Sequence, residues 1–245
     1  MEAVGGLAVL IMLVLISIFA RRIRSGHEVY LRRIPALDRI PHWMSQAVES
    51  GRKIHVSLGT GGVTGSTTAT TLAGLAGLDY LAKQGCGSGA PPLVTVADPM
   101  VLLAAQDVIR RAHIGHGRED EYSATQVEMV APQPAIYALG ASTHLRSDET
   151  AANLMIGSFG TEALLLAEAG AKNKVTQVGG TDDPQAMALL LASTDAPIIG
   201  EEVFAVPAYL HRTPAHLASL QAQDVMRVGI VLLILVAVLL RTFVF

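Results

Sequence analysis

Long apolar runs stand at both ends of the chain, and shorter apolar stretches alternate with polar ones between them. Val4 to Ala20 is an uncharged run of 17 residues, and Val228 to Leu240 is one of 13 that continues past Arg241 to the last residue. A helix that crosses a bilayer needs about 20 apolar residues at about 1.5 Å per residue. We expect transmembrane helices over residues 4–20 and 228–245, with Arg241 at the far interface or at a helix contact.

Each apolar run has an alternative interpretation. A cleaved signal peptide would need a basic start and a cleavage site with small residues, whereas only Glu2 is charged before the first run, which ends in Phe19-Ala20-Arg21. The second run is short enough to be a buried core helix. Its position at the end of the chain, after Arg227, favours a membrane span.

The orientation follows from basic residues close to the two runs. The inner flanks carry several arginines, whereas the outer flanks carry only Arg241. These inner arginines are Arg21, Arg22, Arg24, Arg32, Arg33, Arg212 and Arg227. Because positive charge marks the cytoplasmic side, we predict a two-pass protein of the inner (plasma) membrane. Its central domain lies in the cytoplasm and both termini lie outside.

A basic juxtamembrane connector occupies residues 21–52. Its prolines, Pro35 and Pro41, argue against one continuous helix from Ser25 to Ser50. The connector also holds a set of large apolar residues that either rest on the membrane surface or pack under the domain. These residues are Ile34, Leu37, Ile40, Trp43 and Met44.

Short β-like runs alternate with apolar helical stretches from Lys53 onward. The expected strands are Ile54–Leu58, Leu93–Ala97, Val127–Ala131, Leu154–Ser158, Val175–Val178 and Ile198–Ala205. The expected helices are Thr68–Lys83, Met100–His113, Glu162–Lys172, Pro184–Ser193 and Pro214–Gln223. This alternation predicts an α/β domain over 53–215 with a mainly parallel sheet, followed by a connecting helix over 216–227.

Several short matches recur in the same order in the two halves of this domain. Ser57–Thr60 matches Ser158–Thr161, Val94–Pro99 matches Val175–Pro184 in part, and Val127–Pro132 matches Glu202–Pro207. We predict a duplication of a β-α-β-α-β unit, with copies at about 53–145 and 154–215. The two copies should then superpose strand for strand, bringing Gly59 onto Gly160 and Asp98 onto Asp183.

Composition narrows the function classes. Charged residues make up 16% of the chain and the net charge is −3, so no basic field recruits nucleic acid. The single Cys86 excludes an intramolecular disulfide and a cysteine-built zinc site. Aromatic residues, at 4%, are too few for base-stacking platforms.

The glycine-rich loop over Gly59–Ser66 is the strongest candidate for a binding site. It follows an expected strand and opens an expected helix, where backbone N–H groups favour an anion. No lysine follows its glycines, and Thr64 stands where a dinucleotide fingerprint has its third glycine. The candidate ligand-binding residues are Gly59, Thr60, Gly61, Gly62, Gly65, Ser66 and Asp98.

Asp98 has two interpretations. It could bind a ribose at the end of the second strand, or it could simply cap the helix that Pro99 begins. The matching Asp183-Pro184 pair favours the cap. The loop likewise could be only a tight turn, and Glu162 would repel a phosphate from the matching loop in the second half.

Other reactive side chains form no recognisable catalytic or metal-binding pattern. His113 and His116 stand near Glu119 and Asp120, but glycines at 115 and 117 interrupt the helix that would align the histidines. Ser57, Ser66, His55 and His144 include no nucleophile signature. We therefore expect no catalytic residue, no metal and no cofactor.

Two helices carry almost no charge. Thr68–Ala82 holds only Asp79, and Pro184–Thr194 holds none. Since apolar helices of this kind are buried on most sides, we expect a homo-oligomer whose contacts include helix 68–83 or helix 184–193. Small residues such as Ala73, Gly74 and Gly77 would allow close approach of subunits.

The layout of N-terminal span, arginine cluster, Ser-x-Gly-Thr-Gly-Gly domain and C-terminal span resembles an uncharacterised family of bacterial membrane proteins, a domain of unknown function. The resemblance implies no activity and no functional residues. We expect a membrane-anchored, self-assembling α/β scaffold. The alternative is a domain that binds a small anionic ligand or nucleotide at the Gly59–Ser66 loop, which leaves an enzymatic role open.

Overall fold

The computed structural model describes residues 2–145, 148 and 150–243, which divide into two compact units. One unit combines the two ends of the chain, up to Arg32 and from His211 onward. The other, over Arg33–Leu210, is the α/β domain.

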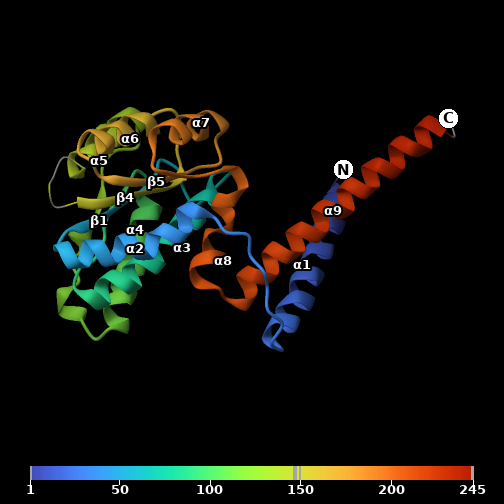
Figure 1. Cartoon of the computed structure of the whole chain (residues 1–245), viewed down its shortest axis with the longest axis horizontal. Coiled ribbons are helices and arrows are strands. Elements are labelled where there is room, and N and C mark those ends of the chain that lie inside the picture. The colour runs from blue at the N-terminus through green and yellow to red at the C-terminus, as the bar shows by residue number, and fades with distance from the viewer. Residues whose placement is uncertain (1, 146–147, 149, 244–245) are drawn as a thin grey trace. The chain divides into compact units, whose positions relative to one another are not determined.

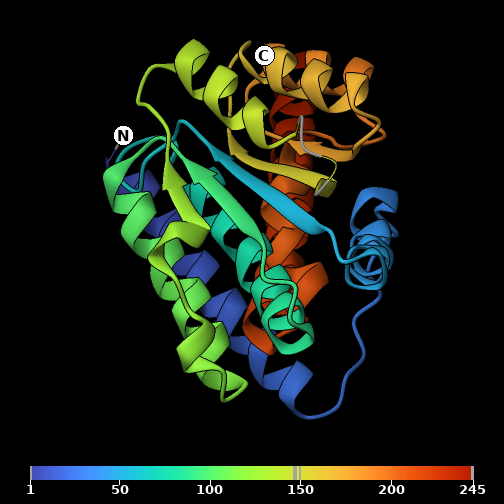
Figure 2. The ribbon, with the colours of Figure 1, turned by 90° about the vertical axis from the view of Figure 1, so that its left-hand side faces the viewer.

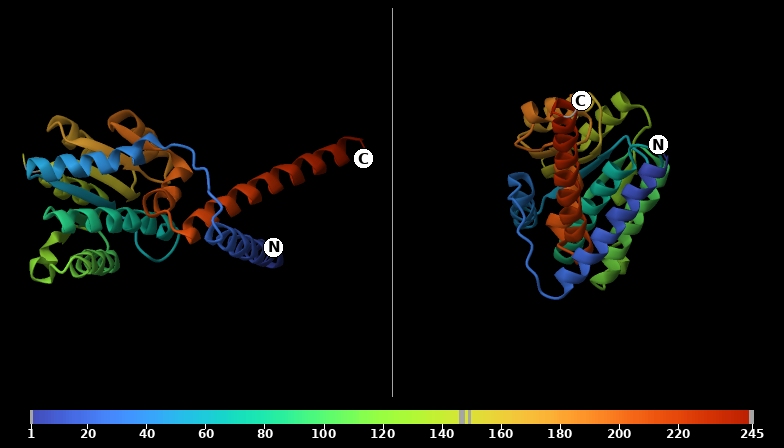
Figure 3. Two further views of the ribbon diagram at one scale, coloured as in Figure 1. Left: turned by 60° about the horizontal axis from the view of Figure 1, so that its bottom comes forward. Right: turned by 90° about the vertical axis from the view of Figure 1, so that its right-hand side faces the viewer.

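The terminal unit is a pair of helices, α1 (Glu2–Arg24) and α9 (Pro214–Phe243). They lie side by side and run in opposite directions, so both chain termini lie at the same end of the pair (Figures 1 and 3). Both are long and apolar enough to cross a membrane, and their spanning segments are not buried. α9 is continuous, so the connecting helix and the second span expected from the sequence form one helix. The three arginines in the last turn of α1 interact favourably with the negative, C-terminal end of its helix dipole.

The domain contains a six-stranded, wholly parallel sheet in the order β3-β2-β1-β4-β5-β6. The strands are β1 (Lys53–Gly59), β2 (Leu93–Val96), β3 (Val127–Met129), β4 (Thr150–Ser158), β5 (Thr176–Gly180) and β6 (Ala196–Ile198). This result confirms the α/β class and the parallel sheet. Central strands β1 and β4 are buried along almost their whole length, as a doubly covered sheet requires.

Helices cover both faces of the sheet (Figures 1 and 2). One face carries α5 (Pro134–His144), α6 (Ala163–Lys172) and α7 (Pro184–Ser193). The other carries α2 (Pro35–Ser50), α3 (Thr68–Ser88) and α4 (Pro99–Gly115). The remaining elements are the 3-10 helices η1 (Glu119–Glu121), η2 (Ala124–Gln126) and η3 (Gly200–Ala205), and helix α8 (Val206–His211).

The connector packs under the domain, which decides between the two alternatives left open by the sequence. The apolar residues from Ile34 to Met44 recur every three or four positions, and all five are buried as α2 packs against β1, β4 and α3. α2 thereby covers sheet surface that α3 and α4 leave open. Pro35 begins the helix, where its missing N–H costs nothing. Pro41, however, lies inside the helix rather than ending it.

The expected strand over Ile198–Ala205 is wrong. β6 ends at Ile198, and η3 follows, in which the Glu202 carboxylate accepts a hydrogen bond from the Ile199 N–H at 3.2 Å. The match between Val127–Pro132 and Glu202–Pro207 therefore joins a strand to a 3-10 helix. Helix α5, which Pro134 begins, was not expected at all.

The small residues of α3 face the sheet rather than a partner subunit. A Cβ at Gly74 would collide with the carbonyl of Ile156 on β4, and one at Gly77 would touch Leu154 and Val206. Ala73 is buried as well. The expectation that these residues allow close approach of subunits is wrong, because they allow close approach of α3 to the sheet.

The strand order reverses between β1 and β4. From this central pair, each half of the sheet runs outward in chain order, as in the doubly wound dinucleotide-binding fold. A duplication would require this order, but halves of this fold share it in any case, so the duplication stays a prediction. The fold alone assigns no function.

Candidate functional site

The glycine loop, residues Gly59–Ser66, lies at the carboxyl end of β1, beside the carboxyl end of β4. Ligands of open α/β sheets bind at the carboxyl ends of the strands, at the point where the strand order reverses. The loop therefore occupies the position where a ligand is expected from topology alone. The predicted loop residues and Asp98, which follows β2, come to this one edge of the sheet.

Gly59 is held by strand β4 and by helix α5. Its φ of +78° is costly for any residue with a side chain, and a Cβ there would collide with the backbone carbonyl of Ser158. The same carbonyl accepts a hydrogen bond from the Thr60 N–H at 2.9 Å. The Gly59 N–H donates to the Tyr137 hydroxyl at 3.2 Å. The first turn of the loop is thus fixed in place.

Gly61 sits between the end of β4 and the first turn of α3. A Cβ on Gly61 would come within 2.5 Å of the Ser158 Cβ and 2.8 Å of the Thr71 Oγ1. Thr71 is fully buried, and its hydroxyl has no hydrogen-bond partner among the described residues. An unpaired buried hydroxyl costs free energy unless something binds it.

The outer part of the loop is open to solvent. Gly65 has a φ of +95°, and its carbonyl accepts a hydrogen bond from the Thr68 hydroxyl at 2.9 Å. The backbone N–H groups from Val63 to Ser66 donate to no acceptor in the described part of the chain. Thr67, the N-cap of α3, makes no side-chain capping bond, and the first turn holds no acid. The N-terminus of α3 is therefore available to an external anion.

Asp98 caps α4 through one carboxylate oxygen, and its other oxygen has no hydrogen bond to a described residue. Its Oδ1 accepts hydrogen bonds from the N–H groups of Met100 at 2.9 Å and Val101 at 3.0 Å. The cap expected from Asp98-Pro99 is confirmed, and Asp183 caps α7 in the same way through Ala186. Asp98 Oδ2 points at Gly62, 3.3 Å from where a Cβ would stand. Capping and ligand binding are therefore compatible.

The second loop, Gly160–Glu162, follows β4 and is closed by its own side chain. The Glu162 carboxylate accepts a hydrogen bond from the Gly160 N–H at 2.8 Å and is buried at the start of α6. The corresponding N–H of the glycine loop, that of Gly59, donates to the Tyr137 hydroxyl instead. Glu162 stands at the helix start, as expected from the sequence, and its repulsion of a phosphate there stays a prediction.

The buried hydroxyl of Tyr137, which the sequence did not reveal, supports the start of the glycine loop. The Tyr137 hydroxyl bonds Ser57 Oγ at 2.6 Å and donates to the Thr95 carbonyl at 3.0 Å, in addition to its bond with Gly59. Burial raises the pKa of the Tyr137 phenol above its ordinary value. Tyr137 comes from α5, the helix the sequence did not predict, so no sequence signal pointed to it.

A polar row crosses the centre of the sheet on the same face. His55 Nδ1 bonds Asn153 Oδ1 at 2.8 Å, its Nε2 bonds Thr95 Oγ1 at 3.0 Å, and Asn153 Nδ2 donates to Gln177 Oε1 at 3.2 Å. Gln177 donates onward to the Ala167 carbonyl at 2.7 Å. Burial lowers the pKa of His55 from 6.5 to about 4, so it is neutral at physiological pH.

These partners leave no serine–histidine pair. Ser57 bonds Tyr137, while Ser66 is exposed on the loop. His144 stacks on His55 at 5.7 Å between ring centroids and bonds the Glu128 carboxylate at 2.9 Å. The structure does not bring a serine hydroxyl to either histidine within the described residues.

His113 and His116 have separate environments. His113 is fully buried in α4 with its ring edge to Tyr122, and neither ring nitrogen has a partner in the described residues. His116 Nε2 bonds the Lys83 carbonyl at 2.8 Å. Among residues 2–145, 148 and 150–243, no group of three or more metal-ligating side chains comes together.

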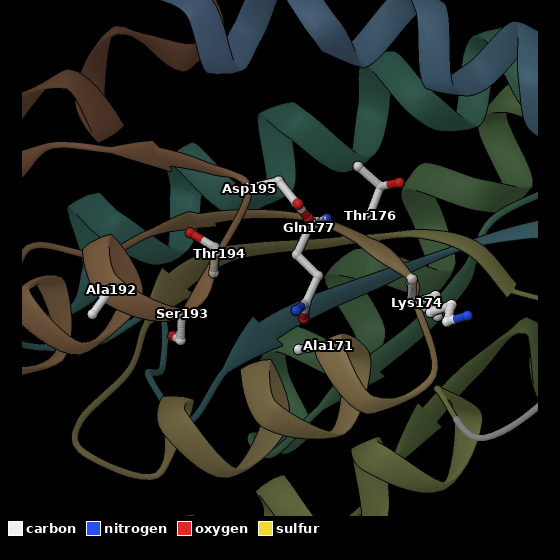
Figure 4. Close-up of a pocket in the computed structure, with 9 residues that line it drawn as sticks. Ala171, Lys174, Thr176, Gln177, Ala192, Ser193, Thr194 and Asp195 are labelled. Carbon is white, nitrogen blue, oxygen red and sulfur yellow. Dashed lines mark hydrogen bonds between the residues drawn. The ribbon is translucent and has the colours of Figure 1, made fainter.

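A polar groove lies at the opposite, amino-terminal edge of the sheet (Figure 4). It has a volume of about 440 Å³ and is lined by the ends of α6 and α7, with Lys174 and Asp195 among its residues. The Gln177 side chain reaches from β5 toward α6, whereas the Lys174 side chain points away from Gln177 (Figure 4). Asp195 is engaged, because its Oδ2 accepts the Gln177 N–H at 2.7 Å. The groove therefore offers few free polar groups to a ligand.

Comparison with known proteins identifies the family. The family model described as "Domain of unknown function (DUF6754)" matches residues 2–245, and the chain belongs to this family. No curated protein and no solved structure matches the chain.

Proposed function

Since the family carries no assigned activity, we propose from the geometry that this protein is a membrane-anchored domain that binds a small anionic ligand at the glycine loop. The observation that carries the proposal is the reversal of strand order between β1 and β4 beside that loop. The reversal puts an uncapped 21-residue helix, α3, at the position where open α/β sheets hold their ligands.

Membrane anchoring is the second part of the proposal. α1 and α9 form an antiparallel pair that would place both termini on one side of a bilayer. The arginines at the inner end of α1 favour the cytoplasmic side. The ligand would therefore come from the cytoplasm.

Thiol labelling tests this topology. A cysteine in place of Glu2 should react with a membrane-impermeant reagent in intact cells, whereas one in place of the exposed Glu119 should react only after lysis. Native Cys86 gives little background, because burial raises the pKa of its thiol to about 11. The reverse labelling pattern would place the domain outside the cell.

A charge placed in the loop tests ligand binding. Ser66 is exposed next to the start of α3, so Ser66→Asp should preserve or slightly stabilise the fold while repelling an anion. Thr161→Asp, at the exposed position in the second loop, is the matched control. We expect at least one of four ligands (phosphate, ADP, ATP and NAD⁺) to raise the melting temperature of the wild type and of Thr161→Asp, but not of Ser66→Asp. The proposal fails if none of these ligands stabilises the wild type.

Self-assembly is a second candidate function, favoured by the outer surface of α7. This helix carries no charge, buries only Ala186 and Leu190, and leaves Leu191 55% exposed. Two membrane anchors would raise the effective concentration of neighbouring copies. Ala188→Glu with Leu191→Glu should lower the mass measured by light scattering in mild detergent, whereas Gln185→Glu on the same helix should not. A monomeric wild type would remove this candidate.

A further inference from the structure

We infer that the ligand of the glycine loop is a dinucleotide whose adenosine ribose has free hydroxyl groups, such as NAD⁺. This inference rests on the proposed function and names the ligand class of the same site. It follows from three features of the carboxyl edge of the sheet: a place for a diphosphate, a free carboxylate oxygen beside it, and a lack of basic side chains.

The diphosphate position lies between the glycine loop and the first turn of α3. Backbone N–H groups from Val63 to Ser66 are unpaired in the described chain, and the helix dipole of α3 favours negative charge. An independent observation points to the same place. The fully buried Thr71 hydroxyl, unpaired in the described residues, faces Gly61 on the floor of the loop. Its Oγ1 would lie 2.8 Å from a Cβ on Gly61, so it sits directly beneath the loop backbone.

The ribose position lies beside Asp98. Asp98 Oδ1 is occupied by two backbone N–H groups of α4, which fix the carboxylate, while Oδ2 faces Gly62 of the loop. A fixed carboxylate oxygen at the end of β2 accepts hydrogen bonds from ribose hydroxyls and repels a phosphate in their place. Because Gly62 has no side chain, the loop backbone can lie close to this carboxylate, which a Cβ at Gly62 would meet at 3.3 Å.

The charge of this edge selects against more highly charged ligands. The segments that follow β1 to β5 contain no lysine or arginine, while Asp98, Glu162 and Asp182 contribute carboxylates. Free phosphate and nucleoside triphosphates would meet this acidic edge without a compensating cation. NAD⁺ suits it better, because its cationic nicotinamide ring offsets part of the diphosphate charge.

The test compares four ligands on the full chain in detergent micelles by isothermal titration calorimetry: NAD⁺, NADP⁺, ADP and inorganic phosphate. We expect NAD⁺ to bind about tenfold or more tightly than NADP⁺, since the 2′-phosphate would face Asp98. Asp98→Asn keeps a good helix cap but loses the charge, so it should reduce the NAD⁺ preference severalfold. Asp183→Asn, the corresponding cap of α7, should leave the preference unchanged.

The outcomes separate the inference from the proposal beneath it. If NADP⁺, ADP or phosphate binds as tightly as NAD⁺ and Ser66→Asp abolishes that binding, the ligand class is wrong and the glycine-loop site stands. If none of the four ligands binds the wild type, both fail. If Asp98→Asn and Asp183→Asn keep the same preference for NAD⁺ over NADP⁺, Asp98 does not bind the ribose and the inference is overturned.

Discussion

The glycine loop and the second loop end neighbouring strands in similar sequence, yet they differ in one respect that decides their chemistry. In the second loop, Glu162 folds back so that its carboxylate meets the Gly160 N–H. In the glycine loop no acidic residue does this, and the Gly59 N–H donates to the Tyr137 hydroxyl. Neither α3 nor α6 has a side-chain capping hydrogen bond. The comparison shows that the second loop carries its own carboxylate, whereas the glycine loop carries none and its N–H groups from Val63 to Ser66 have no acceptor in the described chain.

The largest expected effect on stability comes from replacing a glycine of the glycine loop by alanine, with the same change in the second loop as the comparison. Gly59→Ala combines a left-handed φ with a collision against the Ser158 carbonyl and should lower the free energy of unfolding by about 3 kcal/mol or more. Gly160→Ala meets only the flexible end of Glu162 and should cost less than about 1 kcal/mol. Thermal unfolding of the full chain in detergent measures both. Equal losses would show that the two loops are equally constrained.

Acid should destabilise the domain through His55, on the strand that carries the glycine loop. The folded pKa of His55, about 4, lies below the ordinary value of 6.5, so the unfolded chain binds more protons between these values. The stability contributed above pH 6.5 should be lost as the pH falls to 4, by about 3 kcal/mol in total. His55→Gln should flatten this dependence, whereas His144→Gln should retain it. A slope that survives in His55→Gln would assign it to other groups.

A smaller effect should come from the hydroxyls that support the two loops. Tyr137→Phe leaves the Gly59 N–H and the Ser57 hydroxyl without their partner and should cost about 2 kcal/mol. Thr181 supports the second loop through the N–H and carbonyl of Phe159, at 3.2 and 3.3 Å, and Thr181→Val should cost about 1 kcal/mol. Chemical denaturation compares the two variants. A larger loss of unfolding free energy in Thr181→Val than in Tyr137→Phe would contradict this prediction.

The sequence predicted the features that depend on local pattern. Alternating apolar runs indicated the parallel sheet, and Asp98-Pro99 and Asp183-Pro184 indicated helix starts that the structure confirms. The glycine loop was likewise placed correctly between a strand and a helix. These features need only propensity, spacing and capping chemistry.

Features that depend on tertiary contacts were missed. Small residues on α3 could face a partner or the sheet, and only the approach of Gly74 to β4 decides between them. Tyr137 gains its partners from strands that are more than 40 residues away in the chain. The run Ile198–Ala205 has the apolar character of a strand, but Glu202 bonds the Ile199 N–H and turns it into a 3-10 helix.

The polar row across β1, β4 and β5 has a consequence for folding. Parallel strands of apolar residues can slip by two positions and still bury similar surface. Here, such a slip would separate His55 from Asn153, or Asn153 from Gln177, and leave amide and imidazole groups unpaired in the interior. Each unpaired group costs about 1–3 kcal/mol, which is large beside the stability of a domain. The polar row therefore favours the native register of the central strands over registers shifted by two residues.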